Sequence, residues 1–172
     1  ASRPGNSYQA LISRRFNIDY FNFGFSGNAL GEKTMADYIA ALPMSLFFLD
    51  FDHNSPNAEH LKAHHESFFL NIREKNPDLP VIMATKTDIP RSPAAEKSNA
   101  AHRAVVYETY ENAVKRGDRN VIFIDGATVF SKALTLSAPA DSCTVDGCHP
   151  NDLGFACMAK VFGDAIEKML GL

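Results

Sequence analysis

The sequence predicts an α/β protein built on a parallel β-sheet with helices on both faces. Strand-like and helix-like segments alternate along the chain, which is the pattern of successive β-α-β units. The runs at 45–51 and 80–86 are almost continuously apolar, which is typical of strands buried on both faces. The chain has 172 residues, of which 45% are hydrophobic and 22% charged, so we expect one folded domain over residues 1–172.

The first quarter of the chain combines a helix, a strand, a turn and a second helix. Apolar side chains at helical spacing predict a helix over residues 7–15, after a loop that contains Pro and Gly. The aromatic run at 19–23 predicts a strand, and the Gly-rich residues 24–28 predict a turn after it. A helix over 32–41 follows, and Pro43 ends it.

The middle of the chain holds the two strongest strands and a long helix between them. The apolar run at 45–51 predicts the first of these strands. The helix predicted over 57–75 has an apolar stripe, and the Asn-Pro-Asp sequence at 76–78 ends it. The run at 80–86 predicts the second strand, and the Pro-rich residues 88–93 predict a loop.

The last part of the chain predicts three helices and one strand. A long helix over 94–116 ends at Gly117, which suits a C-cap. Its expected buried side consists of Val105, Val106, Tyr110, Ala113 and Val114. The run at 120–125 predicts the last strand, 127–134 a short helix, and 152–170 the closing helix.

Charge and hydropathy argue against two classes of protein. The net charge is −3 at pH 7, so no basic surface for a nucleic acid is expected. Apolar runs such as Leu46–Leu49 are far too short for a bilayer, so no membrane span is expected. No signal peptide is visible, but the chain begins with Ala1 rather than Met, so we expect a processed or cropped product.

The three cysteines do not form a disulfide framework. Cys143 and Cys148 bracket Asp146 and could close a small loop, but we favour two free thiols. Cys157 falls on the apolar face of the closing helix, where we expect a small buried side chain.

Three histidines in the helix at 57–75 raise the question of a metal site. His60 and His64 are four residues apart, a spacing that can hold a metal ion on a helix, and His65 is adjacent. No second His completes a zincin motif after His65 and Glu66. We therefore interpret the three side chains as the partly exposed flank of the helix and expect no metal.

The pattern with the most chemical content runs from Asp146 to Gly154. It begins in the polar loop at 135–150 and extends into the first turn of the closing helix. Its Asp and His, three residues apart, suit a carboxylate that orients an imidazole and an imidazole that takes a proton from a hydroxyl. Two loops on the side of the sheet where α/β proteins bind ligands offer neutral donors. The backbone N–H of Gly27 and the side-chain amide of Asn54 would stabilise an oxyanion. Together these groups describe acyl transfer to or from an activated nucleophile.

Each of these residues also has a plain structural interpretation. Asp-Gly is an ordinary turn, and a bare Asp-x-x-His occurs often by chance. Asn54 can form an Asx-turn or cap the helix that follows Pro56. We interpret the neighbouring His53 as a loop residue rather than a second base.

In their order and spacing, the segments 22–28, 52–54 and 146–154 resemble those of the SGNH (GDSL-like) hydrolases, a family of serine esterases and acylhydrolases. The resemblance covers essentially the whole chain, and the last segment is the most specific. It implies a three-layer α/β/α, flavodoxin-like fold that needs neither a metal nor an organic cofactor. It also implies four site residues: His149 as the general base, Asp146 as its orienting partner, and Gly27 and Asn54 as oxyanion-hole donors.

The sequence departs from the family pattern at two points. The family's Gly-x-Asn-Asp segment reads Asp-His-Asn-Ser at 52–55, which keeps the Asn. The family's nucleophilic Ser follows a first, central strand, but only six residues precede the helix at 7–15 and none predicts a strand. We therefore expect the strand and the Ser to lie upstream of Ala1, with residues 1–5 as the end of the loop after that Ser.

Two serines within the chain are weaker candidates for the nucleophile. Ser26 is flanked by Gly24 and Gly27, but the Gly-x-Ser-x-Gly pattern of a nucleophile elbow fails because residue 28 is Asn. Ser2 lies near the expected loop, and its place is better explained as family loop sequence.

These observations favour a serine esterase of the SGNH type that removes acetyl or short acyl esters from small molecules or carbohydrates. The resemblance is to bacterial members acting on acetylated carbohydrates, and it favours a secreted or periplasmic location. The alternative is a non-catalytic fragment or ligand-binding domain on the same fold. A sheet without its central strand has unpaired edges, so we expect it to associate with an upstream segment or with a second copy.

Overall fold

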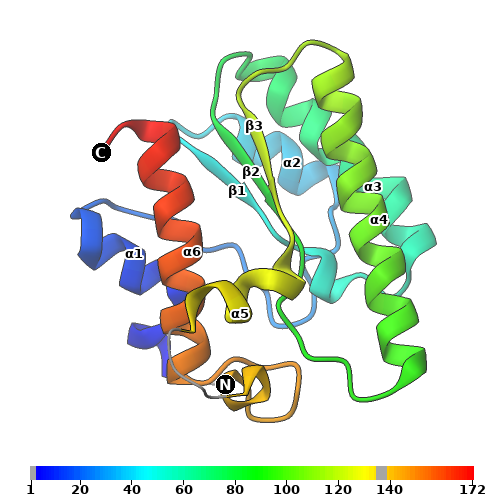
Figure 1. Cartoon of the computed structure of the whole chain (residues 1–172). Helices are drawn as coiled ribbons and strands as arrows, with labels where there is room; N and C mark the ends of the chain where they lie inside the picture. The colour runs from blue at the N-terminus through cyan, green and yellow to red at the C-terminus, as the bar shows by residue number, and fades with distance from the viewer. Residues whose placement is uncertain (1–2, 135–138) are drawn as a thin grey trace. The chain divides into compact units, whose positions relative to one another are not determined.

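The computed structural model describes residues 3–134 and 139–172 (Figure 1). The chain forms two compact units, which are considered separately. The helical unit comprises the described residues of 1–22, 87–93 and 126–172, and the sheet unit comprises 23–86 and 94–125. Ser2 and residues 135–138 of the predicted polar loop lie outside the described residues.

The sheet unit contains a parallel three-stranded sheet. Its strands are β1 (Phe47–Leu49), β2 (Val81–Ala84) and β3 (Val121–Ile124), in the order β1-β2-β3. The register pairs Phe47 with Val81, and Val81 with Val121. All four residues of β2 are buried, as expected for the central strand of a parallel sheet. The mixture of helices and parallel strands confirms the predicted α/β class.

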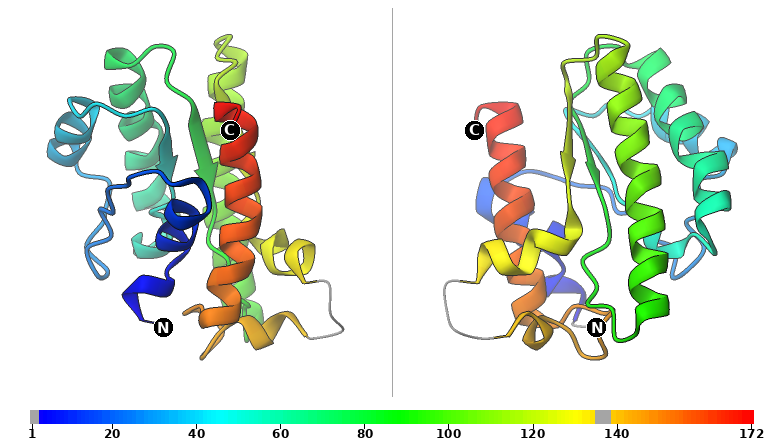
Figure 2. Two further views of the ribbon diagram at one scale, coloured as in Figure 1. Left: turned by 90° about the vertical axis from the view of Figure 1, so that its left-hand side faces the viewer. Right: turned by 45° about the vertical axis from the view of Figure 1, so that its right-hand side comes forward.

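Three helices accompany the sheet: α2 (Lys33–Ala40), α3 (Ala58–Lys75) and α4 (Pro93–Lys115). Helices α3 and α4 run side by side in Figures 1 and 2 and are joined by a hydrogen bond between the buried His65 and Thr109. Both contribute to a core that also includes residues of the sheet. The large side chains of this core include Leu49, Leu61, Phe68, Phe69, Ile72, Val81, Met83 and Val106. The aromatic side chains of Phe51, Phe68 and Phe69 all belong to this core.

The helical unit is organised by α6 (Asp152–Leu170), against which α1 (Tyr8–Phe16) and α5 (Val129–Ala133) pack. The ring of Tyr8 meets that of Phe162 edge to face at a centroid distance of 5.2 Å. Arg15 on α1 pairs with two acids of α6, Asp164 at 2.8 Å and Glu167 at 2.6 Å. Asp164 and Glu167, three residues apart on α6, thus form an ion-paired seam with α1 beside the packed ring of Phe162.

The predicted helices are confirmed within one or two residues at most ends, but the strands differ. The predicted strand at 19–23 does not form, and β1 covers only three residues of the predicted 45–51. A strand needs a hydrogen-bonded neighbour, and the described sheet has no strand beyond β1. The aromatic composition of 19–23 predicted a strand, yet Phe21 is 72% exposed.

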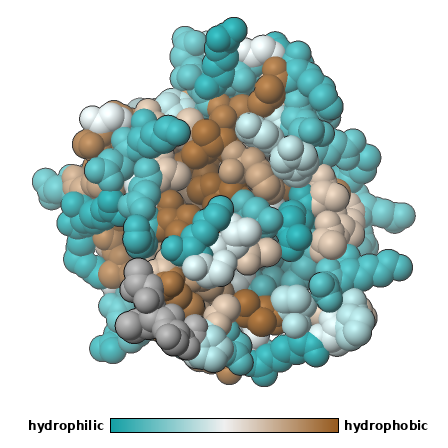
Figure 3. Space-filling model, in the orientation of Figure 1, coloured by the Kyte–Doolittle hydropathy of each residue, from teal (hydrophilic) through white to brown (hydrophobic). Residues whose placement is uncertain are grey.

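Two side chains of the sheet unit lie on the opposite side of their helix from the prediction. Val114 was expected on the buried side of α4 but is 47% exposed, because the helix turns it away from Val106 and Ala113. His65 was expected on a partly exposed flank but is 1% exposed, beneath Phe51 and Thr109. Some other apolar side chains reach the surface between hydrophilic ones, as the brown areas of Figure 3 show for one face.

None of the described helices has both the length and the apolar character that crossing a membrane requires.

Candidate active site

The segment from Cys143 to Asn151, which we call the Asp–His loop, is a narrow hairpin in the helical unit. An isolated antiparallel bridge joins Thr144 to Pro150. The N–H of Val145 donates to the carbonyl of His149 at 2.9 Å, and that of Asn151 donates to the carbonyl of Cys143 at 3.0 Å. These bonds close the loop at its base and leave Asp146 to His149 at its tip.

Asp146 is the acceptor at the tip of the loop. Its Oδ1 accepts the backbone N–H groups of Cys148 at 2.9 Å and His149 at 2.7 Å. Its Oδ2 lies 2.6 Å from His149 Nδ1. The hydrogen bonds from the backbone and ring of His149, followed by that from Cys148, hold the pKa of the Asp146 carboxyl well below its usual value. Asp146 is therefore ionised at neutral pH.

The ionised carboxylate fixes the tautomer of His149. A carboxylate can only accept, so Nδ1 must carry the proton that it donates to Asp146. The Nε2 nitrogen then holds the lone pair, and within the described residues it forms no hydrogen bond. Since the His149 side chain is 61% exposed, this nitrogen is open to a substrate or a nucleophile. The pair is therefore arranged as a general base with its orienting partner.

The local sequence explains why the loop adopts this form. Gly147 has φ +93°, and a Cβ there would lie 3.0 Å from the Ile89 carbonyl oxygen. The Thr144 hydroxyl accepts the Gly147 N–H at 3.0 Å. Asn151 caps α6 by accepting the N–H of Gly154 at 3.0 Å, as expected for an Asn at the N-cap. The turn, its glycine and the start of α6 thus form one continuous structure.

Asn54 lies in the sheet unit, in a 3₁₀ turn (Asp52–Asn54) that follows β1. Its backbone N–H donates to the carbonyl of Phe51 at 3.1 Å, and within the described residues its side-chain amide forms no hydrogen bond. The N-cap of α3 is Asn57, whose side chain accepts the His60 N–H at 2.8 Å. The capping role considered for Asn54 therefore belongs to Asn57, and the Asn54 amide is left as a free donor.

Asp52 holds the turn that carries Asn54, a role that was not predicted from the sequence. Its side chain is 1% exposed, and Oδ2 accepts the backbone N–H of Lys86 at 3.1 Å. This bond ties the turn after β1 to the residues after β2. A carboxylate placed directly after a buried strand was the signal in the sequence that could have identified it.

Gly27 lies at an exposed turn of the sheet unit. Its φ is +87°, and no atom lies within 4 Å of the position a Cβ would take. Asn28 closes the turn, with its N–H 3.2 Å from the Phe25 carbonyl. Among the described residues the Gly27 N–H has no acceptor, so it too is a free donor. The preceding Ser26 has φ 50°, and its hydroxyl makes no hydrogen bond in the part of the chain that the structure describes.

The structure brings Asp146 and His149 together within the helical unit. Gly27 and Asn54 belong to the sheet unit, where no hydrogen bond of the described residues joins them. The predicted meeting of the three loops and the roles of these residues therefore stay predictions.

The cysteines are free thiols, as favoured, and Cys148 is not the neighbour of Cys143. Instead the sulfurs of Cys143 and Cys157 lie 4.0 Å apart, both buried. Burial, followed by the neighbouring Cys157, raises the pKa of the Cys143 thiol to about 12, so it is an inert packing group.

The histidines of α3 form no metal site in the described residues. The rings of His60 and His64 stack at 4.1 Å, with His60 Nε2 on the Leu30 carbonyl and His64 Nδ1 on the His60 carbonyl. His65 points into the core, where burial lowers its pKa to about 4. The three side chains thus have separate structural roles.

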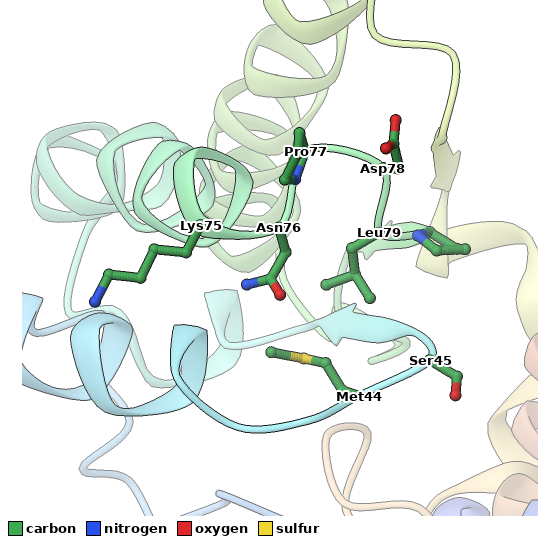
Figure 4. A pocket seen from close by; sticks show the side chains of 8 residues that line it. Met44, Ser45, Lys75, Asn76, Pro77, Asp78 and Leu79 are labelled. Atoms are coloured by element: carbon green, nitrogen blue, oxygen red, sulfur yellow. The ribbon is translucent and has the colours of Figure 1, made fainter.

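A pocket of about 370 Å³ lies in the sheet unit near the amino ends of β1 and β2 (Figure 4). It is bounded by residues 75–80, between α3 and β2, and by Met44 and Ser45 before β1. Ligands of parallel α/β sheets bind beyond the carboxyl ends of the strands, and this pocket lies where β1 and β2 begin. It contains none of the predicted site residues.

Comparisons with known proteins identify the relatives of the chain. The sequence model of the GDSL-like Lipase/Acylhydrolase family matches residues 1–167. No curated protein matched the sequence.

Three solved structures are similar. A Bacteroides ovatus protein described as a GDSL-like lipase is 29% identical, with a TM-score of 0.83 over 99% of this chain and 49% of that one. The salicylyl-acyltransferase SsfX3 of a tetracycline biosynthetic pathway is 22% identical, with a TM-score of 0.73 over 91% and 47% of the two chains. A family two carbohydrate esterase from Clostridium thermocellum is 15% identical, with a TM-score of 0.74 over 98% and 55%. The chain thus spans about half the length of these proteins, and the likeness confirms the predicted fold.

Proposed function

Because the chain belongs to the GDSL-like lipase/acylhydrolase family, we propose that the whole protein hydrolyses carboxylic esters through an activated serine, with His149 as the general base. The observation that carries this proposal is the 2.6 Å hydrogen bond between His149 Nδ1 and the ionised Asp146. It leaves Nε2 as an open, exposed base, which is what a serine nucleophile requires.

In the proposed reaction the nucleophilic Ser lies upstream of Ala1, as the family resemblance implies. His149 Nε2 takes the hydroxyl proton as the Ser oxygen bonds to the ester carbonyl carbon, and an electron pair moves onto the carbonyl oxygen. The imidazolium returns the proton to the leaving alcohol as its C–O bond breaks, which leaves an acyl-enzyme. A water molecule then attacks the acyl carbon while His149 takes its proton, and this proton passes to the Ser oxygen as the acyl–Ser bond breaks and the acid is released. Asp146 stays ionised and stabilises the imidazolium in both halves of the reaction.

The negative charge that develops on the carbonyl oxygen needs donors that are free beforehand. Gly27 and Asn54 are our candidates, since the backbone N–H of the first and the amide of the second form no hydrogen bond in the described residues. A preorganised donor of this kind contributes about 10²- to 10³-fold to the rate of acyl transfer.

The substrate class we propose is an acetyl or short acyl ester of a carbohydrate. It is supported by the similarity to a family two carbohydrate esterase. The other interpretation is a domain that holds such a ligand without turnover.

The test is His149→Ala in the full-length protein, with para-nitrophenyl acetate as the substrate. We expect kcat/KM to fall at least about a thousandfold, because no other group replaces the base. Val145→Ala is the matched control, since it removes an exposed side chain of the same loop. Hydrolysis at the wild-type rate in His149→Ala would contradict the proposal. An intact protein that binds an acetylated sugar but never cleaves it would favour the ligand-binding interpretation.

A further inference from the structure

A second segment of the helical unit lies directly against the Asp–His loop. This segment is the loop at 87–93. The N–H of its Ile89 donates to the carbonyl of Gly147. The carbonyl oxygen of Ile89 is 3.0 Å from where a Gly147 Cβ would be. The backbone of this segment is therefore fixed to the residue that separates Asp146 from Cys148.

The side chain of Arg91 crosses the same glycine. Its Nε is 2.6 Å and its Cδ 3.1 Å from the position of a Gly147 Cβ, so the stem of the arginine occupies the space that the missing side chain leaves. Gly147 follows Asp146 directly and precedes His149 by two residues. The guanidinium thus lies against Gly147, within the loop that carries the acid–base pair.

Among the described residues this guanidinium has no partner. Arg91 is exposed, and within the part of the chain that the structure describes it forms neither an ion pair nor a hydrogen bond. Asp146, the nearest acid in the sequence of the loop, directs its two oxygens to His149 and Cys148. Within the described residues Arg14 and Arg119 likewise form no ion pair. The remaining arginines each pair with an acid, namely Arg3, Arg15, Arg73, Arg103 and Arg116.

Asp146 already balances the positive charge that His149 acquires when it takes the Ser proton, so the acid–base pair does not need the charge of Arg91. Packing against Gly147 does not need the charge, because the stem alone makes that contact. An anionic group of the bound substrate would pair with this free charge and would suit the planar, two-pronged guanidinium.

We propose that Arg91 binds a carboxylate of the substrate, and that the protein prefers esters carried by acidic molecules, such as acetylated sugars that contain a uronic acid. This inference rests on the proposed esterase function and narrows its substrate. The carboxylate belongs either to the alcohol part or to the acyl part of the ester.

The test compares esters that differ only in charge, using the full-length protein at neutral pH and low salt. For the alcohol part, the pair is para-acetoxybenzoate and its neutral methyl ester. For the acyl part, the pair is para-nitrophenyl hemisuccinate and para-nitrophenyl butyrate. The readout is the ratio of kcat/KM for the anionic ester to that for the neutral ester, measured in wild type, Arg91→Gln, Arg91→Lys and Arg14→Gln.

We expect Arg91→Gln to lower this ratio about three- to tenfold for one of the two pairs, mainly through KM, since the ion pair is exposed and screened. Arg91→Lys should keep part of the preference. Arg14→Gln, which removes an exposed cation of α1 and changes the net charge equally, should leave the ratio unchanged. High salt should weaken the preference of the wild type and not that of Arg91→Gln.

Three results would overturn the proposal. A wild-type enzyme that cleaves the neutral esters but shows no ratio that depends on Arg91 would exclude this recognition and leave the esterase function standing. An equal loss on charged and neutral esters in Arg91→Gln and Arg91→Lys would make Arg91 a packing residue of the loop. Failure of the wild type to cleave any of the four esters would overturn the esterase function and the substrate class with it.

Discussion

The Asp–His loop and the two sheet-unit segments around Gly27 and Asn54 carry groups that the proposed reaction uses equally, yet they are held in opposite ways. In the loop, Asp146 already accepts hydrogen bonds from Cys148 and His149. In the sheet-unit segments the donors have no acceptor among the described residues. The difference follows from when each charge exists. The carboxylate is charged throughout and is stabilised in advance by hydrogen bonds, whereas the oxyanion forms only during the reaction and needs donors that are still free.

The largest effect is expected for Asp146→Asn, which changes the acceptor at the tip of the Asp–His loop. The amide would turn its NH₂ group toward Nδ1 of His149, which would move the ring proton to Nε2 and abolish the base. We expect kcat for an ester to fall about 10³- to 10⁴-fold while the protein stays folded. Steady-state kinetics measure the loss, and Asp141→Asn, an exposed acid just before the same loop, is the control. A loss of less than tenfold would mean that the carboxylate does not set the tautomer.

Asn54→Ala tests the other side of the comparison. Removing a free donor should lower kcat about 10²- to 10³-fold and leave KM nearly constant, because the bond forms only in the transition state. Thermal unfolding should change little, since the Asn54 amide holds no other group in place. If instead the unfolding temperature falls and activity follows it, Asn54 is a structural residue of its turn.

A buried histidine gives the two units different responses to acid. The folded pKa of His65 is lowered to about 4, below the ordinary value of 6.5, so the unfolded chain binds the proton first as the pH falls. The free energy of unfolding therefore decreases as the pH falls from about 6.5 to about 4, by up to about 3 kcal/mol. The pKa of Asp146 is lowered as well, but this carboxyl contributes stability above its ordinary value of 3.8 and loses it only below that range.

Urea unfolding at several pH values separates these contributions. His65→Gln should remove most of the loss of stability between pH 6.5 and pH 4, because a neutral amide does not titrate there. His60→Gln, on the same helix, is the control. An unchanged pH dependence in His65→Gln would show that another group titrates in this range.

The sequence predicted the helices better than the strands for a physical reason. Helices α3 and α6 carry their hydrogen bonds within one segment, so apolar periodicity and caps such as Asn57 and Asn151 determine their ends. A strand depends on a neighbour. The run at 19–23 has the composition of a strand without being part of the described sheet.

The chemistry of the Asp–His loop was visible in the sequence because its two residues are neighbours. The residues that surround this loop could not be predicted in the same way, because their positions depend on contacts between distant segments. Arg91 and Gly147 are far apart in the sequence, as are Asp52 and Lys86, and only the folded chain brings them together. The burial of His65 also depends on which face of α3 points into the core, and the positions of His60, His64 and His65 did not determine that face.

The short separation of Asp146 and His149 has a consequence for folding. A loop of about ten residues closes in roughly 10 to 100 ns and at a small cost in chain entropy. The acid–base pair can therefore form as soon as the hairpin between Thr144 and Pro150 closes, long before parallel strands from distant parts of the chain find one another. Its geometry is encoded locally, and its contacts with the rest of the helical unit include the loop at 87–93 and the start of α6.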